Sequence, residues 1–133
     1  MKHFTIIALL FASTTQAQQV MSGAEFDEFS RNTTMYFTEG GLFYGSEQFL
    51  PNRRTIWRAE DGSCVNGKWA EVDGDICFIY DIGSGPHCWE FITNDTNMTI
   101  TNTTGTPNDP PLVLELSGQD TRPILCTGPE FGV

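Results

Sequence analysis

Residues 65–93 read VNGKWAEVDGDICFIYDIGSGPHCWEFIT, and the prediction of the fold starts from them. Runs rich in Val, Ile, Phe, Tyr and Trp alternate here with clusters of Gly, Asp, Ser and Pro, which is typical of antiparallel strands joined by turns. Asp73-Gly74 suits a two-residue hairpin turn because both residues tolerate positive φ. The pattern predicts strands over 65–72, 76–81 and 87–93.

The positions of the turns set which residues face each other across these strands. With one turn at Asp73-Gly74 and the next at Ile82-Gly83, Cys77 lies opposite Cys88. Opposed cysteines in a non-hydrogen-bonded pair are close enough to form a disulfide. We therefore predict a Cys77–Cys88 disulfide, which is compatible with one of the three possible pairings of four cysteines.

The second disulfide, Cys64–Cys126, follows by elimination. It would tie the C-terminal tail to the body of the domain. In the chain-entropy account, a cross-link that closes so long a loop stabilises the fold by roughly 4 kcal/mol.

The same register gathers six apolar side chains on one face of the sheet, and it places Trp69 opposite Phe78. One interpretation is that these side chains form the hydrophobic core. The other is that some of them line a ligand cavity, as they would in a barrel wide enough to hold a small molecule. The six residues are Trp69, Ile76, Phe78, Tyr80, Trp89 and Phe91.

Further strands and one helix are expected outside this stretch. Ser22-Gly23-Ala24-Glu25 has the capping-box pattern, which predicts a short helix over about 23–30. Eight short strands with short connections form an antiparallel meander, which removes its edges by closing into a barrel or folding into a sandwich. We predict a mainly β domain, a single antiparallel meander closing as a lipocalin-like barrel. The additional strands are 33–38, 42–49, 54–60, 97–103 and 111–117.

The N-terminus has the features of a secretory signal peptide over residues 1–17. Lys2 is followed by the apolar run 4–12 and by the small residues Thr15 and Ala17 at the positions that a signal peptidase reads. The apolar run is too short to cross a membrane, which needs about 20 residues. We therefore expect a periplasmic or secreted chain, 18–133, that forms a single β-barrel-like domain with no membrane insertion. Such a location favours disulfides.

The charge of the chain excludes some partners and suggests another. The sequence has 17 acidic and 7 basic side chains, a net charge of −10, and loss of Lys2 with the signal peptide gives −10 − 1 = −11. The basic surface of a nucleic-acid-binding protein is therefore missing. A strongly acidic protein can instead bind a basic partner protein, such as a lysozyme-like hydrolase, through electrostatic attraction.

No catalytic arrangement is visible in the sequence. His87 is the one histidine after the signal peptide, and the motifs of serine hydrolases, zinc proteases and phosphate-binding loops are absent. We therefore expect a non-enzymatic protein with no metal site and no cofactor. A pair of carboxylates could support acid–base chemistry, but no particular pair stands out.

Five residues are candidates for ligand binding. Tyr36, Tyr44 and Trp57 lie on neighbouring predicted strands and add to the aromatic face, which suggests a small apolar or aromatic ligand. Arg53 and Arg54 lie in the turn after the second predicted strand, where they could meet an anion or a carboxylate.

The hairpin of strands 42–49 and 54–60 predicts one further contact. Glu47 can lie opposite Arg58, which would make an ordinary cross-strand ion pair worth a few tenths of a kcal/mol.

Several stretches of the chain resemble small exported proteins of unknown function from alphaproteobacteria of the marine roseobacter type. The resemblance implies a bacterial periplasmic protein and implies no functional residues. The stretches are YGSEQFLPNRR at 44–54, DGSC at 61–64, GDICF at 74–78 and CTGP at 126–129.

Two functional hypotheses follow, and the barrel interior distinguishes them. An open, lined cavity would favour a binding module for a small molecule. A filled core with an acidic concave surface would favour an inhibitor or partner of a basic protein.

Overall fold

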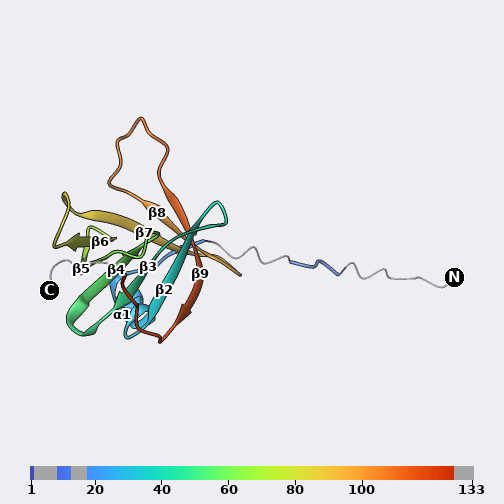
Figure 1. The fold of residues 1–133 in the computed structure, drawn as a ribbon. Coiled ribbons are helices and arrows are strands. Elements are labelled where there is room, and N and C mark those ends of the chain that lie inside the picture. Colours follow the sequence, from blue (N-terminus) through green and yellow to red (C-terminus); the bar gives the residue numbers. More distant parts are fainter. Residues whose placement is uncertain (2–8, 13–17, 128–133) are drawn as a thin grey trace.

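Eight antiparallel strands close into a barrel in the computed structural model, which describes residues 1, 9–12 and 18–127 (Figure 1). Each strand pairs with the next in the chain, and the last pairs with the first. The eight predicted strands are confirmed to within three residues at either end. They are β2 (Thr34–Glu39), β3 (Leu42–Phe49), β4 (Arg54–Ala59), β5 (Cys64–Val72), β6 (Asp75–Tyr80), β7 (His87–Thr93), β8 (Met98–Asn102) and β9 (Val113–Asp120).

One strand lies outside the ring and was not expected. β1 (Gln19–Val20) pairs with Ile92 and Thr93 of β7. β6 pairs only with residues 87–89 of β7. The same edge of β7 is therefore free at residues 92 and 93, and β1 pairs there. The expected meander thus describes β2–β9 and not the whole sheet. Most of the predicted signal peptide, residues 2–8 and 13–17, lies outside the described residues.

The register predicted for β5, β6 and β7 is confirmed. Cys77 faces Cys88, and Trp69 faces Phe78. Asp73 and Gly74 form the β5–β6 turn with φ of 50° and 88°, both positive as the Asp-Gly pair predicts. The next connection is longer than predicted, since residues 81–86 form an irregular loop in place of a two-residue turn.

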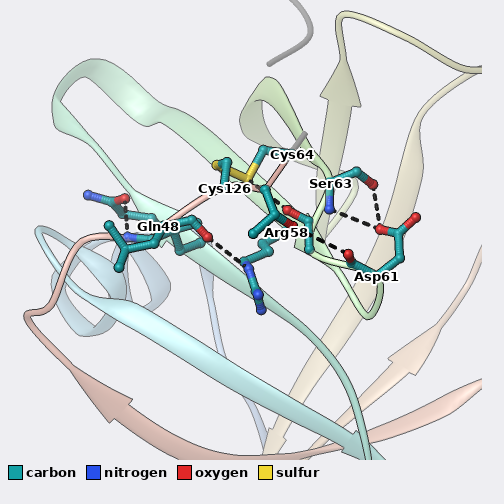
Figure 2. Close-up of a disulfide and its surroundings, with 10 residues drawn as sticks. Gln48, Arg58, Asp61, Ser63, Cys64 and Cys126 are labelled. Atoms are coloured by element: carbon teal, nitrogen blue, oxygen red, sulfur yellow. Dashed lines mark hydrogen bonds between the residues drawn. A yellow bond between two sulfur atoms is a disulfide. The ribbon is translucent and has the colours of Figure 1, made fainter. Parts of the chain in front are cut away.

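Both predicted disulfides are present. The Cα atoms of Cys77 and Cys88 are 4.0 Å apart, and those of Cys64 and Cys126 are 5.7 Å apart. The second bond joins residues 121–127, which we call the strap, to Cys64 at the start of β5 (Figure 2).

Main-chain groups of the strap form hydrogen bonds with both side-chain and main-chain groups of the barrel. The Arg58 guanidinium Nε donates to the Leu125 carbonyl at 2.9 Å, and the Ile124 N–H donates to Gln48 Oε1 at 2.9 Å (Figure 2). The Thr127 N–H donates to the Gly62 carbonyl at 2.9 Å. The disulfide is therefore one of several attachments along the strap.

The helix α1 (Gly23–Ser30) lies at one end of the barrel, away from the projecting β8–β9 loop (Figure 1). Its predicted capping box is confirmed, because the Glu25 N–H donates to Ser22 Oγ and the Ser22 N–H donates to Glu25 Oε1, each at 3.1 Å. The Glu71 carboxylate on β5 also accepts a hydrogen bond from the Gly23 N–H. This contact fixes the start of the helix on the barrel wall.

The helix inserts one ring into the barrel. Phe26 is fully buried, and its ring centroid lies 4.6 Å from that of Phe91, 4.9 Å from that of Trp69 and 5.4 Å from that of Phe49. Aromatic pairs at these separations add to the stabilisation that burial provides. We call this end the closed half. Its buried side chains are Phe26, Met35, Phe49, Trp69, Ile76 and Met98.

Candidate functional site

The other end of the barrel, which we call the open half, contains a cavity of about 250 Å³. An apolar cavity of about 150 Å³ can bind benzene, and ligand pockets commonly begin near 300 Å³, so this space suits a molecule of one or two rings. Two polar side chains, Glu47 and His87, line it. The remaining lining residues are Phe37, Tyr44, Trp57, Phe78, Tyr80, Trp89, Phe91, Ile100 and Leu114.

The cavity is partly open to solvent. His87 is exposed, and Tyr44, Trp57, Tyr80 and Trp89 are half-buried, so these side chains form the mouth. The innermost lining residues are buried and form the floor. They are Phe78, Phe91, Ile100 and Leu114.

The predicted aromatic face lies inside the barrel, where part of it packs in the core and part of it lines the cavity. Trp69 and Ile76 belong to the closed half and are buried in the core. The other four members line the cavity. They are Phe78, Tyr80, Trp89 and Phe91.

Two glycines in the barrel wall make room for rings that line the cavity. A Cβ atom on Gly45 would lie 2.3 Å from the Trp57 ring, and one on Gly67 would lie 2.6 Å from the Tyr80 ring. Because real Cβ atoms do not approach other atoms so closely, only glycine lets these rings occupy their present positions. The absence of a side chain at Gly45 and Gly67 therefore allows the Trp57 and Tyr80 rings to pack against the barrel wall.

The predicted ion pair of Glu47 with Arg58 is wrong. Glu47 faces Trp57, and Arg58 faces Ser46, a shift of one residue from the predicted pairing. A one-residue shift turns every side chain of a strand to the opposite face of the sheet. Glu47 therefore points into the barrel, whereas Arg58 binds the strap.

The Glu47 carboxyl group is 2% exposed and only partly satisfied. The Tyr80 hydroxyl donates to Oε2 at 3.1 Å, and Oε1 has no hydrogen-bond partner within residues 18–127. The Thr55 hydroxyl is likewise buried without a hydrogen-bond partner among the described residues, although it lies close enough to Glu47 to influence the acidity of the carboxyl group. A buried polar atom without a partner is costly and calls for an explanation.

Burial changes the acidity of this pair. Removal from water raises the pKa of Glu47 to about 8, against the weaker opposing effects of the Thr55 and Tyr80 hydroxyls. Burial, followed by the neighbouring Glu47 charge, raises the pKa of Tyr80 well above its usual value near 10. At neutral pH Tyr80 therefore stays a hydroxyl donor, and Glu47 is mostly in its neutral form.

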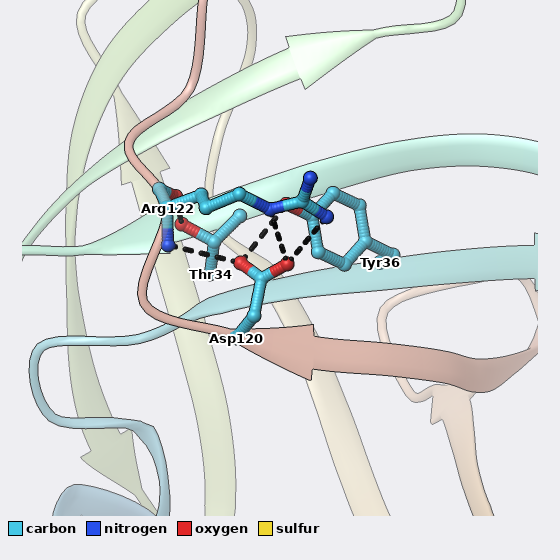
Figure 3. A network of polar contacts seen from close by, with 4 residues as sticks. All are labelled: Thr34, Tyr36, Asp120 and Arg122. Atoms are coloured by element: carbon cyan, nitrogen blue, oxygen red, sulfur yellow. Dashed lines mark hydrogen bonds and ion pairs between the residues drawn. The ribbon is translucent and has the colours of Figure 1, made fainter.

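Of the five candidate residues, Tyr44 and Trp57 come together in the cavity, with ring centroids 5.9 Å apart. Tyr36 does not line it. The Tyr36 hydroxyl donates to Asp120 Oδ1 at 3.1 Å, and the Arg122 Nε donates to Asp120 Oδ2 at 2.9 Å (Figure 3). Tyr36 thus belongs to a polar network that ties β2 to the end of β9.

Arg53 and Arg54 lie at the opposite end of the barrel from the cavity mouth. The guanidinium carbon of Arg53 is 4.5 Å from the centre of the Trp69 ring, a cation–π contact with the closed half. The exposed Arg54 donates from Nε to the Pro51 carbonyl at 3.3 Å. Neither arginine reaches the cavity lining.

Glu47 is the site residue that our sequence analysis missed. A usable signal was present, because Glu47 and Phe49 lie two positions apart on one strand and must share a face. An aromatic ring on that face indicates the barrel interior, and Glu47 should have been placed there with it.

No family model matches this chain, and neither a curated protein nor a solved structure matches it. Among the described residues no group of three or more His, Cys, Asp or Glu side chains could hold a metal ion. No helix in that part of the chain is both long and apolar enough to cross a membrane.

Proposed function

We propose that this protein is a lipocalin-like binding module that takes a small apolar or aromatic molecule into the open half of its barrel. The observation that carries the proposal is the cavity of about 250 Å³, walled mainly by aromatic and aliphatic side chains and partly open to solvent. Concave apolar sites with few polar groups are typical of small-molecule binding.

The proposal extends to the place where binding occurs. Two disulfides within one small domain are typical of oxidising compartments, and the predicted signal peptide would deliver the chain to one. We propose that the protein binds its ligand in the bacterial periplasm, as the resemblance to exported alphaproteobacterial proteins also suggests.

The rival hypothesis of an acidic partner for a basic protein expected a filled barrel. The cavity favours the small-molecule hypothesis, because a surface interaction gives no reason to keep apolar side chains around empty space. The support for the basic-partner hypothesis remains the net charge of the chain.

The test is a titration of the ¹⁵N-labelled mature chain with indole, followed by NMR. Indole in the cavity should shift the amide signals of β3, β4, β6 and β7 and leave those of the strap unchanged. The variant Leu114→Trp, which fills the buried floor, should abolish these shifts. Leu42→Trp makes the same change at a side chain that is 77% exposed and should leave them intact.

Two results would refute the proposal. One is the absence of any cavity shifts at millimolar indole, and the other is a response that Leu114→Trp leaves unchanged. Leu114→Trp must first show the dispersed spectrum of a folded barrel. If it does not, the indole-induced shifts of the original chain decide the question, according to whether they fall on residues that line the cavity.

A further inference from the structure

The cavity contains one acidic side chain, and half of its carboxyl group is unused. Oε2 of Glu47 accepts the Tyr80 hydroxyl, whereas Oε1 has no partner within residues 18–127, although the side chain is 2% exposed. An oxygen in this position can be satisfied by a group that enters the cavity. The orphaned atom therefore points to a polar contact with the ligand.

Among residues 18–127, no lysine or arginine side chain lines the cavity around Glu47. Arg58, on the neighbouring strand β4, is turned outward to the strap. An ionised carboxylate is costly to bury unless a cation accompanies it. A ligand that carries its own positive charge would supply both the missing counter-ion and an N–H donor for Oε1.

The walls of the cavity also favour a cation. Tyr44, Trp57, Tyr80 and Trp89 surround the mouth. Aromatic rings attract ammonium groups through their electron-rich faces, and the attraction grows when water is excluded. The acidic net charge of the chain, −10, would in addition favour the approach of cations over anions.

We propose that the ligand is an organic cation, a protonated amine on a small apolar or aromatic body, whose ammonium group donates to Glu47 Oε1 between the rings of the cavity. This inference rests on the proposed function, because it assigns a chemical class to the molecule that the open half binds. The apolar part of the ligand would lie on the floor formed by Phe78, Phe91 and Leu114.

The first experiment compares three probes of similar size by calorimetric titration at pH 8. The probes are 2-phenylethylamine, which is a cation at this pH, the neutral 2-phenylethanol and the anion 3-phenylpropionate. We expect the amine to bind about tenfold or more tightly than the alcohol, since hydrogen bonds between charged groups exceed neutral ones by that order. The anion should bind most weakly.

Two matched variants locate the preference. Glu47→Gln keeps the shape of the side chain and removes its charge, so the amine should lose its advantage over the alcohol. Glu115→Gln removes the same charge from an exposed position on β9 and should leave the preference intact. Thermal unfolding of both variants checks that each is folded. If Glu47→Gln does not fold, the ranking of the three probes on the original chain still decides the proposal.

The second experiment uses pH to separate an amine from a ligand that accepts a hydrogen bond. Because burial holds the pKa of Glu47 at about 8, an amine must displace a proton below that pH, and its apparent affinity should rise about 50-fold from pH 6 to pH 8. An acceptor ligand would use the protonated carboxyl group as a donor. Its affinity would fall as the pH rises.

Other titratable groups around Glu47 are accounted for in this design. Tyr44 on β3 and Tyr80 on β6 have pKa values raised by burial and stay neutral below pH 9, and β4 contributes only Thr55 and Trp57. Glu39 lies near Tyr44. His87 on β7 lines the mouth, so the rise with pH should persist in His87→Gln and vanish in Glu47→Gln.

The outcomes separate this inference from the proposed function. If the alcohol or the anion binds as tightly as the amine at pH 8, the proposal of a cationic ligand is wrong, but the proposal that the cavity binds a small molecule is supported. A fall in amine affinity between pH 6 and pH 8 would also refute it. If none of the probes binds and indole fails as well, the proposed function itself is wrong.

Discussion

The two halves of the barrel are built from the same eight strands and differ in what fills them. In the closed half, Phe26 of α1 enters between the strands and contacts the rings of Phe49, Trp69 and Phe91. In the open half no helix enters, and Gly45 and Gly67 let two rings stay against the wall. The Phe26 ring thus fills the closed half, whereas the two glycines leave space for the cavity in the open half.

This difference shows how one sheet can enclose both a packed core and a cavity. Aromatic side chains line both halves, but in the closed half Phe26 fills the space between them, whereas in the open half they surround the cavity. Well-packed side chains contribute most to stability, whereas a cavity wall forgoes part of that contribution. The open half therefore contributes less to the stability of the fold than the closed half.

The largest expected effect on stability is that of removing the Phe26 ring. Phe26→Ala should lower the free energy of unfolding by about 3–5 kcal/mol, since a fully buried ring is removed and a new void is left in the closed half. Urea unfolding followed by circular dichroism measures the change. Trp57→Ala, in the open half, should cost roughly half as much because one side of that ring already faces the cavity. Equal losses would show that the two halves contribute alike.

The next effect concerns the pH dependence of stability. The pKa of Glu47 is about 8 in the folded chain and 4.5 as its ordinary value, so folding favours the protonated form. The contribution of this group to stability is complete below pH 4.5 and is lost as the pH rises through 8. Between pH 6 and pH 8 the original chain should lose about 2–3 kcal/mol relative to Glu47→Gln.

Urea unfolding of both chains at several pH values measures this difference. Glu115→Gln provides the control, because an exposed carboxyl group should give no such trend. A stability difference between the original chain and Glu47→Gln that stays constant from pH 6 to pH 8 would mean that Glu47 is not held in its neutral form.

The smallest effect should come from the wall glycines. Gly45→Ala places a methyl group against the Trp57 ring and close to the Arg58 carbonyl, so the ring must move, at a cost of about 1–3 kcal/mol. Gly105→Ala is the control, since the nearest atom to its new methyl would lie 3.8 Å away. Tryptophan fluorescence should change in the first variant and not in the second. An unchanged spectrum and stability in Gly45→Ala would contradict the proposed role of this glycine.

The two hairpins of the wall explain which parts of the structure could be predicted from the sequence. The Asp73-Gly74 turn has one strongly preferred geometry, so the β5–β6 register, and with it the Cys77–Cys88 disulfide, followed from it. The β3–β4 connection contains no such signal. Asn52 and Arg53 both adopt positive φ there, 62° and 59°, which is uncommon for residues other than glycine.

That uncommon loop is the reason that the key residue of the site was misplaced. The loop sets Phe49 opposite Thr55, and this pairing sends Glu47 inward. Tyr44 and Trp57 were recognised because aromatic residues on neighbouring strands suggest a cavity wherever the barrel is open. Tyr36 was assigned with them, but alternation along β2 turns Met35 and Phe37 inward and leaves Tyr36 to the network with Asp120.

The pairing of β9 with β2 has a consequence for the behaviour of the chain in a crowded compartment. It joins Thr34 to Asp120 and Thr38 to Glu115, so that the backbone N–H and C=O groups of both strands are used inside the molecule. A strand with a free edge can template pairing with another chain and begin aggregation. By joining its first and last long strands, this barrel withholds those two edges from its neighbours, and protection from self-association is built into the same closure that forms the cavity.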